Sequence, residues 1–421
     1  MSSSTAVSAD RSVRHYLVVL TGILLCFGPC AFALSCAGIF FKPVAASLDV
    51  HLGTFTFYLT IMLVVTALIL PVEGMLMEKF DLRLVLSAGV ACIGVPLVAM
   101  SFFTSPWQFY IAGAIMGLGL ASSLVLAVPT LINRWFQEKV GFYIGLCMAF
   151  TGIGGAVFNL VGGAFIDSGP EGWRMGYRVF GILTLAVVLP CTALIVRSRP
   201  QDVGLLPFGA TRVTHQDQAA PQTRGIAASE VFSYPAFFTL AIFAALMNLG
   251  VNLYQYFAAY ASSLTDRPQV VAAAAALASA AMLGQASGKL LIGLINDYVN
   301  IKAGFLFATI SGLVGLAVIM FLAFSSPVIL IGGFVFGIFY ASATVLMPLI
   351  TRSLFGPREY SAIYSRIAMV GALCGAFAVT LWGMSVERFG FIATFTVGLV
   401  VIAAAFVVGM LTLFMGRKIE Y

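Results

Sequence analysis

The chain has 421 residues and a formal net charge of +6, and 61% of its residues are hydrophobic whereas only 9% are charged. Because roughly a quarter of the residues of an ordinary soluble domain are charged, this composition excludes a soluble globular protein and indicates an integral membrane protein. Residues 1–15 contain neither a short apolar core nor a small-residue cleavage site, so we predict no removable signal peptide. The seven cysteines all lie in apolar runs, which is typical of small buried side chains and not of a disulfide framework.

Twelve hydrophobic runs follow one another along the chain, and each is long enough for a membrane-spanning helix, which needs about 20 residues. Hydropathy places them at 16–41, 55–77, 84–104, 108–132, 141–165, 177–196, 236–262, 270–296, 303–324, 327–350, 360–384 and 390–415. One long polar stretch, rich in Pro, Gly, Thr and Gln, separates the first six runs from the last six. We therefore predict an all-α membrane protein with two six-helix bundles (16–196 and 236–415), a linker (197–235) and short tails at 1–15 and 416–421.

The distribution of basic residues predicts the orientation of these spans. Of the 22 Lys and Arg residues, 15 lie on the same side of the membrane as both termini, two fall within spans, and five lie on the other side, namely Lys42, Arg174, Arg178, Arg267 and Arg388. Cytoplasmic segments of membrane proteins carry the excess of Lys and Arg. We therefore predict cytoplasmic termini in a plasma or inner membrane, and the positive charge implies no nucleic-acid partner.

The two predicted bundles carry related sequences. The decad Gly74–Arg83 follows the second run and the decad Gly293–Lys302 follows the eighth, 219 residues later; each has a glycine, an acid four residues on and a cation nine residues on. The same shift pairs Pro129 with Pro348, and repeated halves are typical of transporters. Glycine lets helices approach closely, and the charges could pair across neighbouring helices. We predict a conformational latch made of Gly74, Glu78, Lys79, Arg83, Gly293, Asp297 and Lys302; the alternative is a solvated basic loop.

On these decads the chain resembles the major facilitator superfamily, over nearly its whole length. Glu78 stands where Asp is commoner, and Asp81 where glycine is usual. Three further motifs are similar to the group of monocarboxylate transporters and oxalate–formate antiporters: Gly38-Ile-Phe-Phe-Lys-Pro43, Asn133-Arg-Trp-Phe-Gln-Glu-Lys-Val-Gly141 and Gly172-Trp-Arg174. The resemblance implies the major facilitator fold, with twelve helices in two six-helix bundles around a central cavity, and transport by alternating access.

Lys289 is the residue that the sequence marks most clearly for function. It lies eight residues before Asp297, about 12 Å from the end of its span at a rise of 1.5 Å per residue. A cation at this depth is costly and usually faces a cavity and a partner. No acidic residue lies near the middle of any predicted span, so we predict that Lys289 binds a substrate carboxylate. The resemblance implies the same, because related organic-anion carriers hold a substrate-binding arginine four residues before the glycine that is Gly293 here. The alternative is a lysine that reaches for the interface along its own stem.

Five further residues are predicted to contact the substrate. Arg366 lies near the start of the eleventh span, where a gating role and an interfacial role are both open. Asn248, Asn252 and Tyr256 follow one another at i, i+4 steps and could hydrogen-bond a carboxylate, or instead join neighbouring helices. By the resemblance, Tyr340 falls on a pocket position.

We predict a secondary active transporter of a small organic anion, a monocarboxylate, with proton coupling. The second central lysine of oxalate-type antiporters would fall on Gly371, and one cation suits one carboxylate. The acid of the proton-linked relatives would fall on Gln285, which does not titrate, so we expect Lys289 itself to exchange the proton. An organic-anion exchanger of the oxalate–formate kind, a sugar or drug facilitator and a non-transporting membrane sensor remain alternatives.

An enzyme is not predicted, because the chain shows no metal-binding set of His, Asp and Glu, no glycine-rich phosphate loop and no arrangement of Ser, His and Asp for nucleophilic catalysis. The expected partners are a small carboxylate, protons and the lipid bilayer. We predict no cofactor, no metal and a monomeric protein.

Overall fold

The computed structural model describes residues 12–210 and 225–416. Their contacts divide the chain into two compact units: unit 1 is Met1–Ile226 with Gly356–Ser365, and unit 2 is Ala227–Phe355 with Arg366–Tyr421. The predicted tails and the predicted linker lie partly outside the described residues. The predicted bundle boundaries stay a prediction, and the short segment Gly356–Ser365 is the part whose contacts differ from them.

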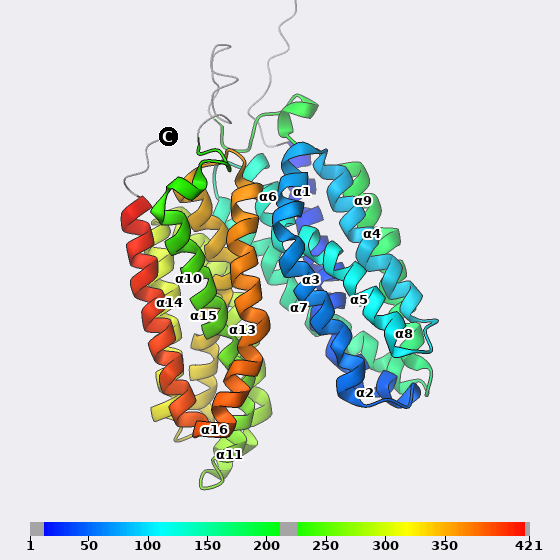
Figure 1. Ribbon diagram of the computed structural model, residues 1–421, viewed down its shortest axis with the longest axis vertical. Helices are drawn as coiled ribbons and strands as arrows, with labels where there is room; N and C mark the ends of the chain where they lie inside the picture. The colour runs from blue at the N-terminus through cyan, green and yellow to red at the C-terminus, as the bar shows by residue number, and fades with distance from the viewer. Residues whose placement is uncertain (1–11, 211–224, 417–421) are drawn as a thin grey trace, which may run out of the picture. The chain divides into compact units, whose positions relative to one another are not determined.

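The described part of the chain holds eleven helices that are long and apolar enough to cross a membrane. The last of them, α16 (Tyr360–Gly416), has 57 residues, or about 85 Å of helix, against a hydrocarbon core of about 30 Å. Gly390 interrupts it with φ +78° and ψ 171°, and the ribbon reverses within α16 (Figure 1). Divided at Gly390, the helices give twelve spans, so the predicted all-helical membrane fold is confirmed.

Unit 1 contains the first six spans, three of which include π-helical turns. The elements are α1 (Val13–Leu25), the π-helical segment Cys26–Ser35, α2 (Ala37–Ser47), α3 (Leu52–Lys79), α4 (Leu82–Met100), α5 (Pro106–Leu120), the π-helical segment Ala121–Leu126, α6 (Ala127–Trp135), α7 (Val140–Asp167), α8 (Gly172–Leu183), the π-helical segment Thr184–Val188 and α9 (Leu189–Ile195). We call the end at which α3, α6 and α9 terminate the linker end of unit 1.

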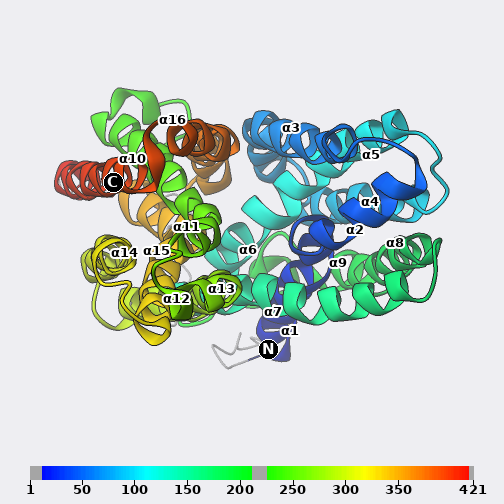
Figure 2. The same ribbon diagram turned by 90° about the horizontal axis from the view of Figure 1, so that it is seen from below.

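Unit 2 contains the remaining spans. Its elements are α10 (Pro235–Val251), the 3₁₀ turn Asn252–Tyr256, α11 (Phe257–Ser263), α12 (Pro268–Ala272), α13 (Ala274–Tyr298), α14 (Ile301–Phe321), α15 (Ser326–Phe355) and α16. Both α13 and α14 pack against α15, and Figure 2 shows these helices end-on. The 3₁₀ turn interrupts the seventh span at the residues for which the sequence predicts one continuous helical face.

The internal repeat appears in the structure as a matched pair of helix starts. The carboxylate of Asp81 accepts a hydrogen bond from the backbone N–H of Arg83 (3.0 Å) at the start of α4. Exactly 219 residues later, the side-chain oxygen of Asn300 accepts one from the N–H of Ala303 (2.8 Å) at the start of α14. Such N-caps satisfy backbone donors that have no partner within the helix. Asp81 stands where the resemblance of the decad leads one to expect glycine, and its side chain caps α4.

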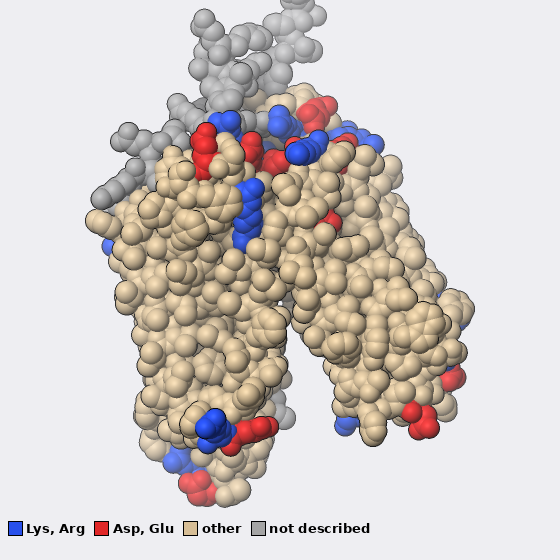
Figure 3. Space-filling view, viewed as in Figure 1, with Lys and Arg blue, Asp and Glu red and all other residues tan. Residues whose placement is uncertain are grey.

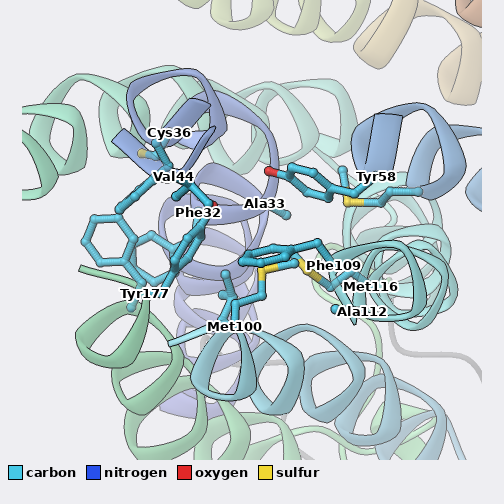
Figure 4. Packing of buried hydrophobic residues seen from close by; sticks show 14 of the residues in the cluster. Phe32, Ala33, Cys36, Val44, Tyr58, Met100, Phe109, Ala112, Met116 and Tyr177 are labelled. Atoms are coloured by element: carbon cyan, nitrogen blue, oxygen red, sulfur yellow. The ribbon is translucent and has the colours of Figure 1, made fainter. Parts of the chain in front are cut away.

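Aromatic rings fill the interior of unit 1 near the ends of α5 and α8 that lie away from the linker end. Phe32 stacks on Phe180 with centroids 4.4 Å apart, and Phe40 stacks on Tyr177 at 4.3 Å. Figure 4 shows Phe32, Tyr177 and Phe109 within this cluster. Because lipid tails are as apolar as these rings, close packing stabilises the cluster more than removal from water does.

The surface separates charged ends from an uncharged middle. On the face shown in Figure 3, Lys, Arg, Asp and Glu gather at the two ends and the band between them is almost free of charge. Large apolar side chains are exposed on the helices, for example Leu160 on α7 at 78% and Leu194 on α9 at 72%. An apolar surface of this extent is not found on soluble monomers, so lipid is its solvent.

Candidate functional site

Glycines bring α13 and α15 into direct backbone contact in unit 2. A Cβ atom on Gly284 would lie 2.8 Å from the carbonyl carbon of Phe334, and one on Gly288 would lie 2.7 Å from the Cα of Ile338. From the other helix, a Cβ on Gly337 would lie 2.8 Å from the backbone nitrogen of Gln285. Interlocked small residues of this kind let helices pack closely in membranes. They fix the position of α13 against α15.

Lys289 lies on α13 immediately beside this contact. It is only 2% exposed, and Gln285, one turn earlier on the same helix, is 8% exposed. The side chain of Tyr340 on α15 lies beside those of Gln285 and Tyr254, and the rings of Tyr254 and Tyr340 stack with centroids 4.8 Å apart. We call Lys289, Gln285, Tyr340 and Tyr254 the Lys289 cluster. Three elements of unit 2 therefore bring the neutral polar groups Gln285, Tyr340 and Tyr254 together, and Lys289 lies one helical turn after Gln285 on α13.

Asn248 and Tyr256 of the seventh span lie against α16. Gly371 lies beside Asn248, with a distance of 2.6 Å from its would-be Cβ to the Asn248 amide nitrogen. The amide of Asn248 donates to the carbonyl of Ala244 (2.9 Å), and that of Asn252 donates to the carbonyl of Asn248 (2.7 Å). The Tyr256 hydroxyl donates to the Val379 carbonyl on α16 (2.5 Å). The Tyr256 bond joins two helices, whereas the amides of Asn248 and Asn252 donate to carbonyls of their own span.

Arg366 lies apart from these residues, at the start of the part of α16 that belongs to unit 2. Its guanidinium donates to the carbonyl of Ala228 (2.5 Å) and lies 5.0 Å above the ring of Phe232. Both partners belong to the segment that leads into α10. These contacts favour an anchoring role for Arg366 over substrate contact.

Two residues of the predicted latch, Gly74 and Glu78, belong to a connected set of contacts in unit 1. One carboxylate oxygen of Glu78 accepts from the Arg134 guanidinium (3.0 Å) and the other accepts from the backbone N–H of Ser361 (2.9 Å). Ser361 lies in the first turn of α16, and a helix N-terminus attracts negative charge. A Cβ on Gly74 would lie 2.5 Å from the carbonyl oxygen of Ser361. Gly74 and Glu78 therefore both hold the segment Gly356–Ser365 against α3.

The other predicted latch residues are less engaged. Lys79 is exposed at the end of α3. Arg83 is 39% exposed in its side chain and lies 3.9 Å from Asp81, a separation at which a surface ion pair contributes little. In the second decad Gly293 is buried, the Asp297 carboxylate accepts from Asn296 (3.0 Å), and Lys302 is exposed.

Arg134 takes part in the latch contacts, although its sequence position does not predict this role. Its guanidinium pairs with Glu78 and also donates to the carbonyl of Met77 (2.7 Å). The sequence feature that could have indicated this role is the position of Arg134 in the motif Asn133–Gly141, where a cation stands next to Trp135 at the end of an apolar helix. Arg134 belongs to α6, however, and no sequence spacing connects it with the decad on α3.

The first part of the predicted linker is docked on the linker end of unit 1. The N–H of Phe208 donates to the carbonyl of Trp135 (2.8 Å), and the N–H of Gln137 donates to the carbonyl of Phe208 (2.9 Å). The Ser198 hydroxyl accepts from the N–H of Leu82 (2.8 Å) and donates to Asp81 (3.0 Å). We call residues 198–209 the strap. It is a folded part of unit 1.

Cutting the chain tests the strap and the predicted linker together. A break placed between residues 211 and 224 leaves the strap on the N-terminal piece, so the two coexpressed pieces should copurify as a folded membrane protein. A break between Val196 and Arg197 removes the strap from that piece and should lower its yield and melting temperature. Equal behaviour of the two cuts would contradict a structural role for the strap.

No group of three or more His, Cys, Asp and Glu residues that could hold a metal ion occurs within residues 12–210 and 225–416. The candidate sites in the described part of the chain are the Lys289 cluster in unit 2 and the Glu78 contacts in unit 1.

Comparison with known proteins identifies the family. A family model described as Major Facilitator Superfamily matches residues 23–267, more than half of the chain. The solved structure of the proton:xylose symporter XylE bound to 6-bromo-6-deoxy-D-glucose superposes with a TM-score of 0.70 at 14% identity, over 97% of this chain and 95% of that chain. At this identity the likeness concerns the fold.

Curated relatives match shorter stretches of the chain. Monocarboxylate transporter 1 of Rattus norvegicus is 31% identical over 148 residues, which are 35% of this chain and 29% of the relative. Probable transporter MCH2 of Saccharomyces cerevisiae is 29% identical over 147 residues, 35% of this chain and 27% of the relative. Glucose-6-phosphate exchanger SLC37A2 of Xenopus laevis is 29% identical over 141 residues, 32% of this chain and 27% of the relative.

The match thus spans less than a third of the length of each of these three relatives. The family model, the twelve apolar spans and the superposed fold agree with one another, and they agree with the resemblance that the decads indicate. The chain is a multi-pass integral membrane protein and belongs to the major facilitator superfamily.

Proposed function

We propose that this protein is a secondary active transporter of a small organic anion, a monocarboxylate, which it moves by alternating access coupled to protons. The observation that carries the proposal is the position of Lys289, a lysine only 2% exposed within the membrane-spanning helix α13. An ionisable side chain at such a depth is costly and marks a substrate or ion pathway in membrane proteins.

The surroundings of Lys289 support an anion over a neutral substrate. The other members of the Lys289 cluster, Gln285, Tyr340 and Tyr254, are neutral hydrogen-bonding groups held by α13, α15 and the 3₁₀ turn. A sugar can be bound by neutral groups alone, whereas a carboxylate gains most from a cation in a low-dielectric setting. Arg366 is already engaged by Ala228 and Phe232. Lys289 brings one positive charge to the neutral groups of the Lys289 cluster, and one cation fits a single carboxylate.

The relatives support the class of substrate without deciding between members of it. One is named a monocarboxylate transporter and another a glucose-6-phosphate exchanger, and both names specify an anion. The exchanger name makes anion exchange the second candidate mechanism. The excess of Lys and Arg on one side of the spans supports the further proposal that both termini face the cytoplasm.

A thermal-shift screen of the purified protein tests the substrate class. Ligands that bind the folded state raise its stability by about 2.7 kcal/mol at a hundredfold excess over Kd. Monocarboxylates should raise the melting temperature of the wild type, and Lys289→Gln should abolish that rise. The matched control is Arg366→Gln, which also removes one cation from unit 2; it should lower the basal melting temperature but keep the ligand-induced rise.

Three outcomes would redirect the proposal. Stabilisation by a neutral sugar that persists in Lys289→Gln would point to a sugar facilitator. Stabilisation by glucose 6-phosphate but by no monocarboxylate would favour an organic phosphate as the anion. Loss of the ligand response in Arg366→Gln but not in Lys289→Gln would transfer substrate binding to Arg366.

Coupling is measured separately in liposomes. A pH gradient that drives monocarboxylate uptake into vesicles with an empty lumen supports symport, and uptake that requires a carboxylate inside supports exchange. Lys289→Arg should retain binding but lose proton-driven uptake, because a guanidinium does not release its proton in the working range. Full proton-driven uptake by Lys289→Arg would show that another group carries the proton.

A further inference from the structure

His15 is buried where the strap meets unit 1. It lies in the first turn of α1, is 2% exposed, and meets the rings of Trp135, Phe136 and Phe208 edge-on at centroid distances of 5.7, 6.0 and 5.9 Å. Its Nε2 lies 3.0 Å from the carbonyl oxygen of Leu206 in the strap. A carbonyl can only accept, so Nε2 carries the proton and donates it.

The other ring nitrogen of His15 has no such partner. Its Nδ1 is buried and makes no hydrogen bond among the described residues. In the neutral imidazole with the proton on Nε2, this atom is a bare acceptor, which an aromatic pocket tolerates at modest cost. A second proton would place a donor and a full positive charge at this buried position, where residues 12–210 and 225–416 supply no acceptor for it. The protonated ring is better solvated outside the pocket.

Each element that contacts His15 also carries charged residues close to it in the sequence. They are Arg14 on α1, Arg134 on α6, Glu138 and Lys139 in the turn after α6, and Arg197, Arg199 and Asp202 around the strap. Arg134 pairs with Glu78, and Asp202 accepts from the N–H of Arg199 (2.9 Å). None of them forms an ion pair or a hydrogen bond with the imidazole in the described part of the chain.

We propose that His15 is a positioning residue that makes the docking of the strap depend on pH: the neutral imidazole holds the strap through the carbonyl of Leu206, and protonation of the ring releases it. This inference goes beyond the proposed function and does not depend on the identity of the substrate.

Release of the strap would affect the latch contacts of Glu78 through the end of α6. The strap binds the backbone of Trp135 through Phe208, and the preceding residue, Arg134, holds Glu78. Trp135 itself is also tied to this end of the chain, because its indole N–H donates to the carbonyl of Arg197 (3.1 Å). Acidification on the side of the membrane that carries the strap therefore loosens the end of α6 that positions Arg134, and the transport rate becomes sensitive to pH on that side.

Hydrogen exchange of the full-length protein in detergent tests the proposal. Protection factors, corrected for intrinsic exchange, are measured for peptides covering the strap from about pH 8 to about pH 5.5, the range over which an ordinary imidazole titrates. We expect strap protection in the wild type to fall by about fivefold or more on acidification, the size that loss of one hydrogen bond predicts. Peptides from α14 should keep their protection and serve as the internal reference.

Two variants separate titration from packing. His15→Gln keeps an N–H donor for Leu206 but cannot titrate, so strap protection should become independent of pH and the pH profile of transport should flatten. The matched control is His51→Gln, which removes an exposed histidine of unit 1 that does not contact the strap; it should behave as the wild type.

Three results would overturn the proposal, and the first does not require any variant to fold. Strap protection in the wild type that is constant, or that rises, on acidification would show that the pocket accepts the imidazolium. An unchanged loss of protection in His15→Gln would assign the effect to another group, and Asp202→Asn would then identify it. A flattened profile in His51→Gln would show that the response does not originate at His15.

Discussion

Gly284→Ala is expected to destabilise unit 2 by at least about 1–3 kcal/mol, the cost of overpacking a close contact, and to lower the yield of folded protein. The new methyl group would lie 2.8 Å from the carbonyl carbon of Phe334 and closer still to its oxygen. These are backbone atoms, which cannot move aside without separating α13 from α15. The melting temperature of the purified protein in detergent measures the effect.

The matched control for this variant is Gly375→Ala in α16. The same methyl group there would meet nothing closer than 3.5 Å, which is an ordinary van der Waals distance. We expect a melting temperature equal to or slightly above that of the wild type, because alanine restricts the unfolded chain more than glycine does. If the two substitutions lowered the melting temperature equally, the glycine contact between α13 and α15 would not be what fixes the position of Lys289.

Glu78→Gln is expected to slow transport by about tenfold or more while leaving substrate affinity unchanged. The carboxylate accepts charge-assisted hydrogen bonds from Arg134 and from the N–H of Ser361, and such bonds contribute about 1.5–3 kcal/mol each. The Arg134 side chain is only 16% exposed, so water replaces the lost charge poorly. Equilibrium binding by thermal shift and exchange rates in liposomes are the two measurements.

Arg83→Gln is the matched control for the latch. Although the repeat predicts a latch role for Arg83, its side chain is 39% exposed and 3.9 Å from Asp81, so its removal should change the exchange rate by less than about twofold.

Gly74→Leu should reproduce the Glu78→Gln defect by displacing Ser361. Gly53→Leu on the same helix should not, because a Cβ there meets nothing within 4 Å. Lost binding with normal exchange in Glu78→Gln would contradict the latch.

Hydropathy was sufficient to predict the spans but not their internal geometry. The composition requires helices of about 20 residues, and all twelve predicted runs correspond to spans. The 3₁₀ turn at Asn252–Tyr256 was not predictable, because its residues are compatible with an α-helix and the turn depends on packing against α16. The predicted i, i+4 face nevertheless exists, since Asn248 and Tyr256 both contact α16.

The contacts around the candidate sites were predictable only in part. A lysine in an apolar span indicates a buried cation from the sequence alone, and Lys289 is buried. The pairing of Glu78 with Arg134 joins α3 to α6 and depends on how those helices cross, which no spacing reports. His15 stands just before the first hydrophobic run, which begins at residue 16, and that run does not indicate its contacts. It lies in the first turn of α1, covered by Leu206 and Phe208 of a segment nearly two hundred residues away.

The break at Gly390 constrains how the last part of the chain enters the bilayer. The two halves of α16 are joined without any intervening non-helical stretch beyond that one glycine, and Glu387 and Arg388 stand just before it. A translocation machinery therefore has no polar loop to thread between the two crossings, and they must integrate together as a hairpin. A reporter or epitope inserted at residues 389–391 would separate this hairpin, whereas the turn between Ser263 and Pro268 offers a place where inserted residues leave both neighbouring helices whole.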